Sequence, residues 1–112
     1  MTHFPAVSHC VFISAFPGRS AALGECLAHL VEGTLKAPGC LQCAAQRAAH
    51  DEGTWMLSAQ WASDEALGGW LASPSMEVFS LLVRDQLVTR IDVQTFDSVY
   101  SRSAAPQLRR AG

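Results

Sequence analysis

The chain has 112 residues, which is the size of one domain. Apolar residues make up 49% of it and charged residues 16%, against about 25% charged residues in ordinary soluble chains. This composition excludes an intrinsically disordered chain, which needs low hydrophobicity and high net charge. The formal net charge of −2 excludes a basic field that would attract nucleic acid or an anionic membrane.

The distribution of apolar residues also indicates where in the cell the protein is expected. No apolar run approaches the ~20 residues that cross a bilayer. The first seven residues lack the basic start and apolar stretch of a signal peptide. We therefore expect a soluble, cytoplasmic protein with a single domain over residues 1–100 and a polar tail over residues 101–112.

The first half of the chain predicts a strand followed by a helix. Residues 8–16 are apolar on both alternating faces, as in a strand that is covered on both sides. From Ala21 the apolar period becomes that of a helix, with a stripe of Leu, Cys and Val residues that reaches Thr34. Pro38 and Gly39 end this helix.

The second half predicts a hairpin, two helices and a last strand. The hairpin strands are expected over residues 41–49 and 54–61. A serine precedes acidic residues at one helix start and a proline at the next, which are both good capping arrangements. The helices and the strand after them are expected over residues 64–71, 74–87 and 88–100.

This order of elements indicates an α+β fold, the ferredoxin-like β-α-β-β-α-β split unit. Its helices can cover only one face of a four-stranded sheet. The other face would carry small, amide-rich and partly apolar side chains such as Gln42, Met56, Ser58 and Gln94. Because a bare sheet face of this kind is suited to burial against a second copy, we expect a homodimer.

Cys40 and Cys43 form a C-x-x-C pair, which can bind metal or exchange disulfides when both sulfurs point one way. On a strand, positions three apart point to opposite faces. No second pair of cysteines or histidines completes a metal site. We therefore expect reduced, structural thiols and no metal. The alternative is a thiol-redox protein, which needs both sulfurs on one side of the backbone.

Four short motifs follow one another at a characteristic spacing. They are Pro38-Gly39-Cys40-Leu41, Ala59-Gln60-Trp61, Ala62-Ser63-Asp64-Glu65-Ala66-Leu67 and Trp70-Leu71-Ala72-Ser73-Pro74. Through them, residues 8–97 resemble the antibiotic biosynthesis monooxygenase family. The resemblance implies a dimeric α/β barrel made of two ferredoxin-like units. It also implies one of several activities, because members oxidise phenols or quinols with O₂ and no cofactor, degrade haem, or isomerise small signalling molecules.

For the cofactor-free monooxygenases, the resemblance implies a dry, apolar pocket between sheet and helices. Trp61 matches a tryptophan that lines this pocket, where its N–H would bond a phenol oxygen, although a tryptophan here can equally be core. No histidine occurs over residues 74–87, so haem degradation is not expected. The family's polar asparagine, tyrosine and arginine fall on Leu57, on Leu67, and on Phe79 or Ser80.

Two other polar residues are candidates to replace those groups. Arg47 shares the helix-facing side of its predicted strand and would pair with a phenolate, unless it extends into solvent. His9 titrates near neutrality and would act as a base, unless it is an ordinary surface or satisfied histidine. Gly68 and Gly69 precede Trp70, and their backbone freedom would let this segment adjust around a ligand.

The expected function is that of a cofactor-independent monooxygenase that oxidises a small aromatic phenol or quinol with O₂. The predicted catalytic residues are Trp61, Arg47 and His9, and the predicted substrate-binding residues are Leu57, Trp70, Phe79 and Val83. No metal, cofactor, nucleic acid or membrane partner is expected. The alternative is a non-catalytic, dimeric small-molecule-binding member of the same family, which the missing polar residues favour.

Overall fold

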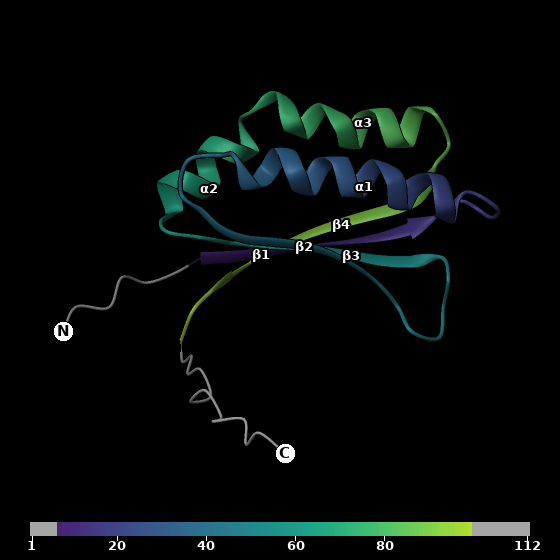
Figure 1. Ribbon diagram of the computed structural model, residues 1–112, viewed down its shortest axis with the longest axis horizontal. Helices are drawn as coiled ribbons and strands as arrows, with labels where there is room; N and C mark the ends of the chain where they lie inside the picture. The colour runs from purple at the N-terminus through teal and green to yellow at the C-terminus, as the bar shows by residue number, and fades with distance from the viewer. Residues whose placement is uncertain (1–6, 100–112) are drawn as a thin grey trace, which may run out of the picture.

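The computed structural model describes residues 7–99 of the chain. Its elements are β1 (Val7–Ala15), α1 (Ser20–Leu35), β2 (Cys40–Arg47), β3 (Thr54–Trp61), α2 (Asp64–Leu71), the 3₁₀ turn η1 (Pro74–Met76), α3 (Glu77–Arg84) and β4 (Val88–Asp97). The helices all lie on one face of a single sheet (Figure 1). This arrangement confirms the predicted α+β, ferredoxin-like fold. The predicted polar tail lies outside the described residues.

The sheet has the strand order β2-β3-β1-β4, and every neighbouring pair is antiparallel. The apolar strand β1 is therefore central, between β3 and β4. Cover on both faces of β1 was expected, but within one chain only its helix-facing side is buried. Val11 and Ile13 are at most 1% exposed, whereas Phe12 between them is 38% exposed on the opposite face. No helix covers that opposite face, as expected because the helices of this fold can cover only one face of the sheet.

The core lies between the sheet and the helices, where leucines of α1 pack on the helix-facing side chains of β1 and β3. Side-chain caps fix the starts of two helical segments. Ser63 Oγ accepts a hydrogen bond from the Ala66 amide at 3.1 Å, and Ser73 Oγ accepts one from the Ser75 amide at 3.3 Å. The first cap confirms the predicted start of α2, whereas Ser73 caps the 3₁₀ turn η1 and α3 begins only at Glu77.

An irregularity in β2 changes which of its side chains face the helices. Cys40 pairs with Trp61, but the next residue to pair with β3 is Gln42. Leu41 is therefore the extra residue of a β-bulge, and it is 59% exposed. Because the bulge shifts the alternation by one residue, Cys43 also lies on the helix-facing side with Cys40. The prediction that these two cysteines point to opposite faces is wrong for this reason.

No single helix within residues 7–99 is long and apolar enough to cross a membrane. The bent pair formed by Asp64–Leu71 and Pro74–Arg84 meets the length and composition criteria only when its two parts are taken together.

Candidate functional site

Three aromatic side chains from separate elements meet between the sheet and α2. His9 comes from β1, Trp61 from the end of β3 and Trp70 from α2, and none of them is more than 3% exposed. Trp61 Nε1 donates a hydrogen bond to His9 Nδ1 at 3.0 Å. The rings of His9 and Trp70 stack with centroids 4.6 Å apart and an interplanar angle of 24°. We call His9, Trp61 and Trp70 the aromatic cluster.

Local structure explains why these three side chains meet. In the register of β1 and β3, His9 lies opposite Ala59, so Trp61 is its diagonal neighbour on the same face. The Ser63 cap starts α2 directly after β3 and brings Trp70 back over the sheet. Trp70 Nε1 then donates a hydrogen bond to Thr34 Oγ1 at 3.2 Å, which ties α2 to the last turn of α1.

Phe79 contacts the aromatic cluster, and Leu57 lies in the same core. The Phe79 ring, from α3, meets Trp70 edge-on with centroids 6.3 Å apart. Leu57 is fully buried in the same core as these rings. The structure thus brings together five of the seven predicted site residues, namely His9, Leu57, Trp61, Trp70 and Phe79.

One nitrogen in the aromatic cluster lacks a hydrogen-bond partner. His9 Nε2 is buried, and no atom within residues 7–99 bonds to it. Because Nδ1 accepts the Trp61 N–H, a neutral His9 carries its proton on Nε2. The site therefore presents an N–H donor without an acceptor, an arrangement that costs about 1–3 kcal/mol. Buried polar atoms are nearly always hydrogen-bonded, so an unpaired one needs an explanation, such as a bound ligand or a water.

Burial lowers the pKa of His9 below its ordinary value of 6.5. The hydrogen bond from Trp61 acts in the same direction, because an imidazolium would turn a second N–H toward the indole N–H. His9 is thus a neutral imidazole at neutral pH.

This lowered pKa predicts a dependence of stability on acid pH. The unfolded chain binds a proton at His9 near pH 6.5, whereas the folded chain does not. The free energy of unfolding therefore has its full value above this pH. Below it, the free energy of unfolding should fall by up to about 1.4 kcal/mol per pH unit until the folded pKa is reached. Urea unfolding of the wild type and of His9→Phe at a series of pH values measures the difference. Parallel pH profiles would contradict the prediction.

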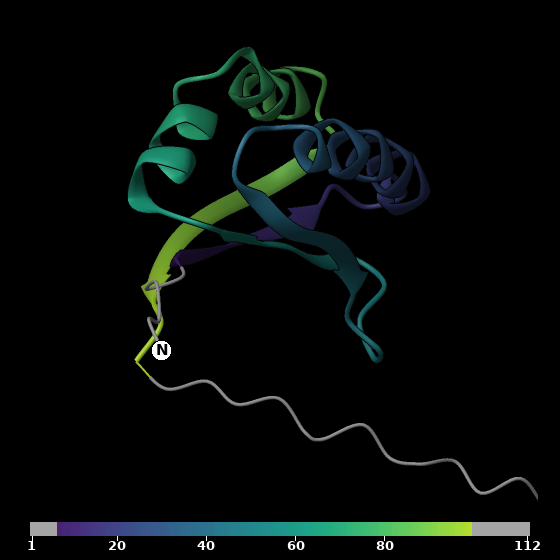
Figure 2. The same ribbon diagram turned by 60° about the vertical axis from the view of Figure 1, so that its left-hand side comes forward.

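The sheet beside His9 is not covered by helices. Thr95 and Val93 of β4 lie next to His9 and Val11, on the same side of the sheet. Thr95 is exposed and Val93 is 40% exposed. In Figure 2, β4 forms the outer edge of the sheet, with α2 on the helical side. Val93 and Thr95 therefore form an exposed edge of the sheet beside the buried aromatic cluster.

The prediction for Val83 needs correction. Val83 is 56% exposed, so it does not line the space between sheet and helices. The 3₁₀ turn η1 displaces the start of α3 to Glu77, and the buried stripe of α3 then consists of Phe79 and Leu82. The residue after Leu82 lies about 100° around the helix axis, which turns Val83 toward solvent.

The structure brings Arg47 to a different tryptophan. Arg47 ends β2 on the helix-facing side, and its guanidinium carbon lies 5.8 Å from the centroid of the Trp55 ring. Trp55 and Trp61 are six residues apart on β3, which is about 20 Å along the strand. Arg47 is exposed and far from His9, as the solvent-facing alternative expected.

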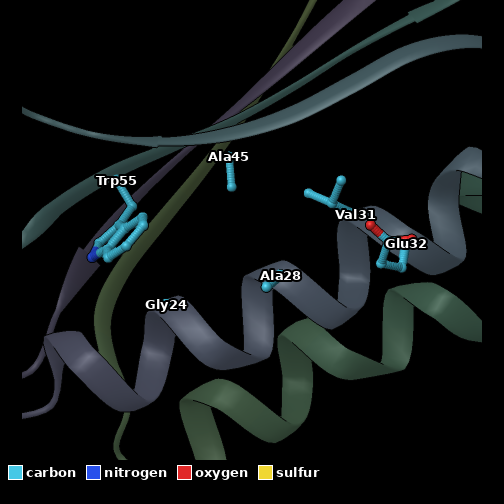
Figure 3. A pocket seen from close by; sticks show the side chains of 6 residues that line it. All are labelled: Gly24, Ala28, Val31, Glu32, Ala45 and Trp55. Atoms are coloured by element: carbon cyan, nitrogen blue, oxygen red, sulfur yellow. The ribbon is translucent and has the colours of Figure 1, made fainter.

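A groove of about 300 Å³ lies beside Trp55, between α1 and the β2–β3 side of the sheet (Figure 3). Its lining comprises Gly24, Ala28, Val31, Glu32, Ala45 and Trp55. A Cβ atom at Gly24 would lie 2.8 Å from the Trp55 ring, so glycine is what allows the ring to pack there. The sequence did not predict this groove. Small residues create its space, whereas the predicted site was based on stripes of large apolar residues.

The shared face of Cys40 and Cys43 meets the geometric condition of the thiol-redox alternative, but the surroundings of the two thiols favour a structural role. Both pack against the core. Burial, followed by the neighbouring Cys40, raises the pKa of Cys43 to about 11. Burial also raises the pKa of Cys40. Thiols with raised pKa values stay protonated at neutral pH and are weak nucleophiles.

Two further expectations concern α2 and metal binding. Gly68 and Gly69 lie inside α2 with open space around them, and they do not interrupt the helix that packs Trp70. Among residues 7–99, no three His, Cys, Asp or Glu side chains gather closely enough to hold a metal ion.

The fold and the buried aromatic cluster define a ferredoxin-like α+β domain whose candidate site lies between sheet and helices. The chain belongs to the antibiotic biosynthesis monooxygenase family, because the sequence model of that family matches residues 7–80. A search of curated proteins finds no match.

Solved structures share this fold at low sequence identity. The PA3566 protein of Pseudomonas aeruginosa is 24% identical, with a TM-score of 0.76 over 88% of this chain and 100% of its own. A Deinococcus radiodurans protein, by name a candidate antibiotic biosynthesis monooxygenase, is 20% identical, with a TM-score of 0.78 over 90% of this chain and 99% of its own. Rv0793 of Mycobacterium tuberculosis is 21% identical, with a TM-score of 0.75 over 88% and 99% of the two chains.

Proposed function

We propose that the protein is a cofactor-independent monooxygenase that oxidises a small aromatic phenol or quinol with O₂. The observation that carries the proposal is the unpartnered N–H of His9 in the wall of the aromatic cluster. Apolar rings around a single unused polar atom suit a flat aromatic ligand with one oxygen to place. The proposed approach of the ligand is across the exposed edge formed by Val93 and Thr95.

The proposed reaction needs only the phenol and O₂. The phenolate transfers one electron to O₂, which gives a phenoxyl radical and superoxide. These combine into a hydroperoxide, which loses water and leaves a quinone. One oxygen atom of O₂ ends in the quinone and the other in water. The protein's contribution is to orient the ring against Trp70, to bind the phenol oxygen and to exclude water.

We also propose that the protein acts as a homodimer joined through the bare face of the sheet. Phe12, beside the partly exposed Met56, is 38% exposed on that face, and Phe96, opposite Ser8, is 43% exposed. These side chains form an apolar patch on the side of the sheet opposite the helices. Burial of this patch against a second copy would remove it from water while leaving the aromatic cluster of each protomer free.

Oxygen uptake in metal-free buffer with a panel of phenols and hydroquinones tests the activity. We expect one O₂ consumed for each quinone formed, and a loss of about 100-fold or more in kcat/KM for His9→Phe, which removes the donor. His29→Phe is the matched control, because His29 is exposed on α1 and should leave the rate unchanged. Uptake no faster than that in buffer, across the panel, would overturn the proposal.

The second candidate is a non-catalytic small-molecule-binding protein of the same family. A specific observation favours it: Leu57 is 0% exposed and Leu67 is 5% exposed. The positions that the resemblance assigns to polarising groups are therefore part of the core. Binding of phenols without any oxygen uptake would establish this candidate in place of the first.

A further inference from the structure

We propose that the groove beside Trp55 is a second ligand site, which binds an aromatic ring that carries a primary amine on a short carbon chain. The groove is separate from the aromatic cluster, because Trp55 and Trp61 are about 20 Å apart along β3. The inference does not depend on the proposed function, which assigns the phenol to the aromatic cluster. Three features of the groove support it, namely a fixed ring, a space between small side chains and an unpaired carboxylate.

Contacts on several sides hold the Trp55 ring in place. Its Nε1 donates a hydrogen bond to Ser20 Oγ at 2.9 Å, and the same hydroxyl donates to the backbone carbonyl oxygen of Glu52. The ring packs on Gly24, where a Cβ atom would lie 2.8 Å from Cη2. A glycine inside a helix is less favourable than alanine, so this one is placed where the ring needs the space. Trp55 therefore presents a preorganised aromatic surface to the groove, which binding does not have to order.

Small side chains leave room for a second ring next to Trp55. Ala28 of α1 and Ala45 of β2 line the groove from its two sides, around a space of about 300 Å³ (Figure 3). This volume is at the lower end of the range for small-molecule sites, so it suits one aromatic ring with a short chain. The apolar part of the ligand fits between Ala28 and Ala45. There its ring can meet Trp55 in the offset or edge-on contacts that aromatic pairs prefer.

The carboxylate of Glu32 gives the groove its charge. Glu32 is an exposed residue of α1 and the charged member of the groove lining. Within residues 7–99 the single ion pair joins Arg84 to Asp85, so no cation of this part of the chain pairs with Glu32. Glu32 comes one helical turn after Ala28, which is about 6 Å along the axis of α1. An ammonium group joined to the ring by two or three carbons spans this distance of about 6 Å.

Arg47 determines the direction in which such a ligand lies. Its guanidinium carbon is 5.8 Å from the centroid of the Trp55 ring, and Trp55 and Glu32 lie at opposite ends of the groove in Figure 3. The positive charge of Arg47 disfavours an ammonium at the Trp55 end, whereas Glu32 attracts it at the other end. The groove is on the helical side of the sheet, so a dimer joined through the bare face would leave it open.

2-Phenylethylamine is the probe, and the three tryptophans of the chain report where it binds. We expect the amine, added to about 10 mM, to shift the indole N–H resonance of Trp55 and not those of Trp61 and Trp70. 2-Phenylethanol, which has no charge, should bind about fivefold more weakly. 3-Phenylpropionate, an anion, should not bind. No shift at Trp55, equal shifts of all three indoles, or equal affinities for the amine and the alcohol would overturn the inference.

Two variants test the residues that the inference assigns. Glu32→Gln keeps the size of the side chain, and its affinity for the amine should be about fivefold lower. Glu65→Gln, the same change at an exposed residue of α2, is the matched control and should bind as the wild type does. Ala28→Leu fills the groove from an exposed position of α1 and should abolish binding, with the resonances of Trp61 and Trp70 unchanged as proof of folding. Unchanged affinity in Glu32→Gln or Ala28→Leu would overturn the inference and leave the proposed function untouched.

Discussion

Replacing Leu57 with asparagine is expected to lower the free energy of unfolding by about 3–5 kcal/mol. Leu57 is fully buried on β3, between Val11 of β1 and Ala45 of β2. The change removes apolar contacts and places an amide among side chains that offer it no hydrogen bond. It is also a test of where the site lies, because the family resemblance puts a polarising asparagine at this position.

Leu57→Met is the matched control, since it keeps the volume and should cost less than about 1.5 kcal/mol. Equilibrium urea unfolding of both variants, with the slope against denaturant compared, gives the two values. If the asparagine variant is as stable as the methionine variant, a polar space adjoins Leu57. The ligand site would then extend along β3 beyond the aromatic cluster. If the asparagine variant loses stability as predicted, no polar space adjoins Leu57, and His9 is the polar group of the candidate site.

Much of the fold could be predicted from the sequence, because the apolar residues of most helices and strands recur with the period of a helix or a strand. The stripe of α1 and the serine before α2 are properties of neighbouring residues, and the structure has both elements where they are expected. The gathering of Trp61, Trp70 and Phe79 follows from the order of the elements together with the side of the sheet that the helices cover. None of these inferences requires the exact pairing of one strand with another.

Other features depend on such pairing and could not be predicted. The bulge at Leu41 leaves no trace in composition, yet it decides the side on which Cys40 lies. The bond between Trp61 and His9 joins residues 52 positions apart and depends on the register of two strands. A sequence can thus propose His9 as a base from its ordinary pKa, while only the register shows which nitrogen is free.

Gly39→Ala is expected to destabilise the protein by about 2–5 kcal/mol, through backbone strain and a steric clash. Gly39 has a φ of +82°, and a Cβ atom there would lie 2.5 Å from the Cβ atom of Ala66 on α2. Gly18→Ala isolates the first cause, because Gly18 has a φ of +81° with no neighbouring atom within 4 Å. It should cost only about 1–2 kcal/mol.

The difference between these two variants measures how tightly α2 is held against the loop before β2. Because Ala66 and Trp70 share α2, an alanine at Gly39 should also displace Trp70 from Thr34 and disturb the stacked His9 ring. Urea unfolding gives the stabilities, and the indole N–H resonances of the folded variants report the displacement. Equal losses of stability for both glycines, with unchanged indole resonances, would mean that α2 yields to the added methyl group. The His9 ring would then lack the rigid support that keeps its donor in place.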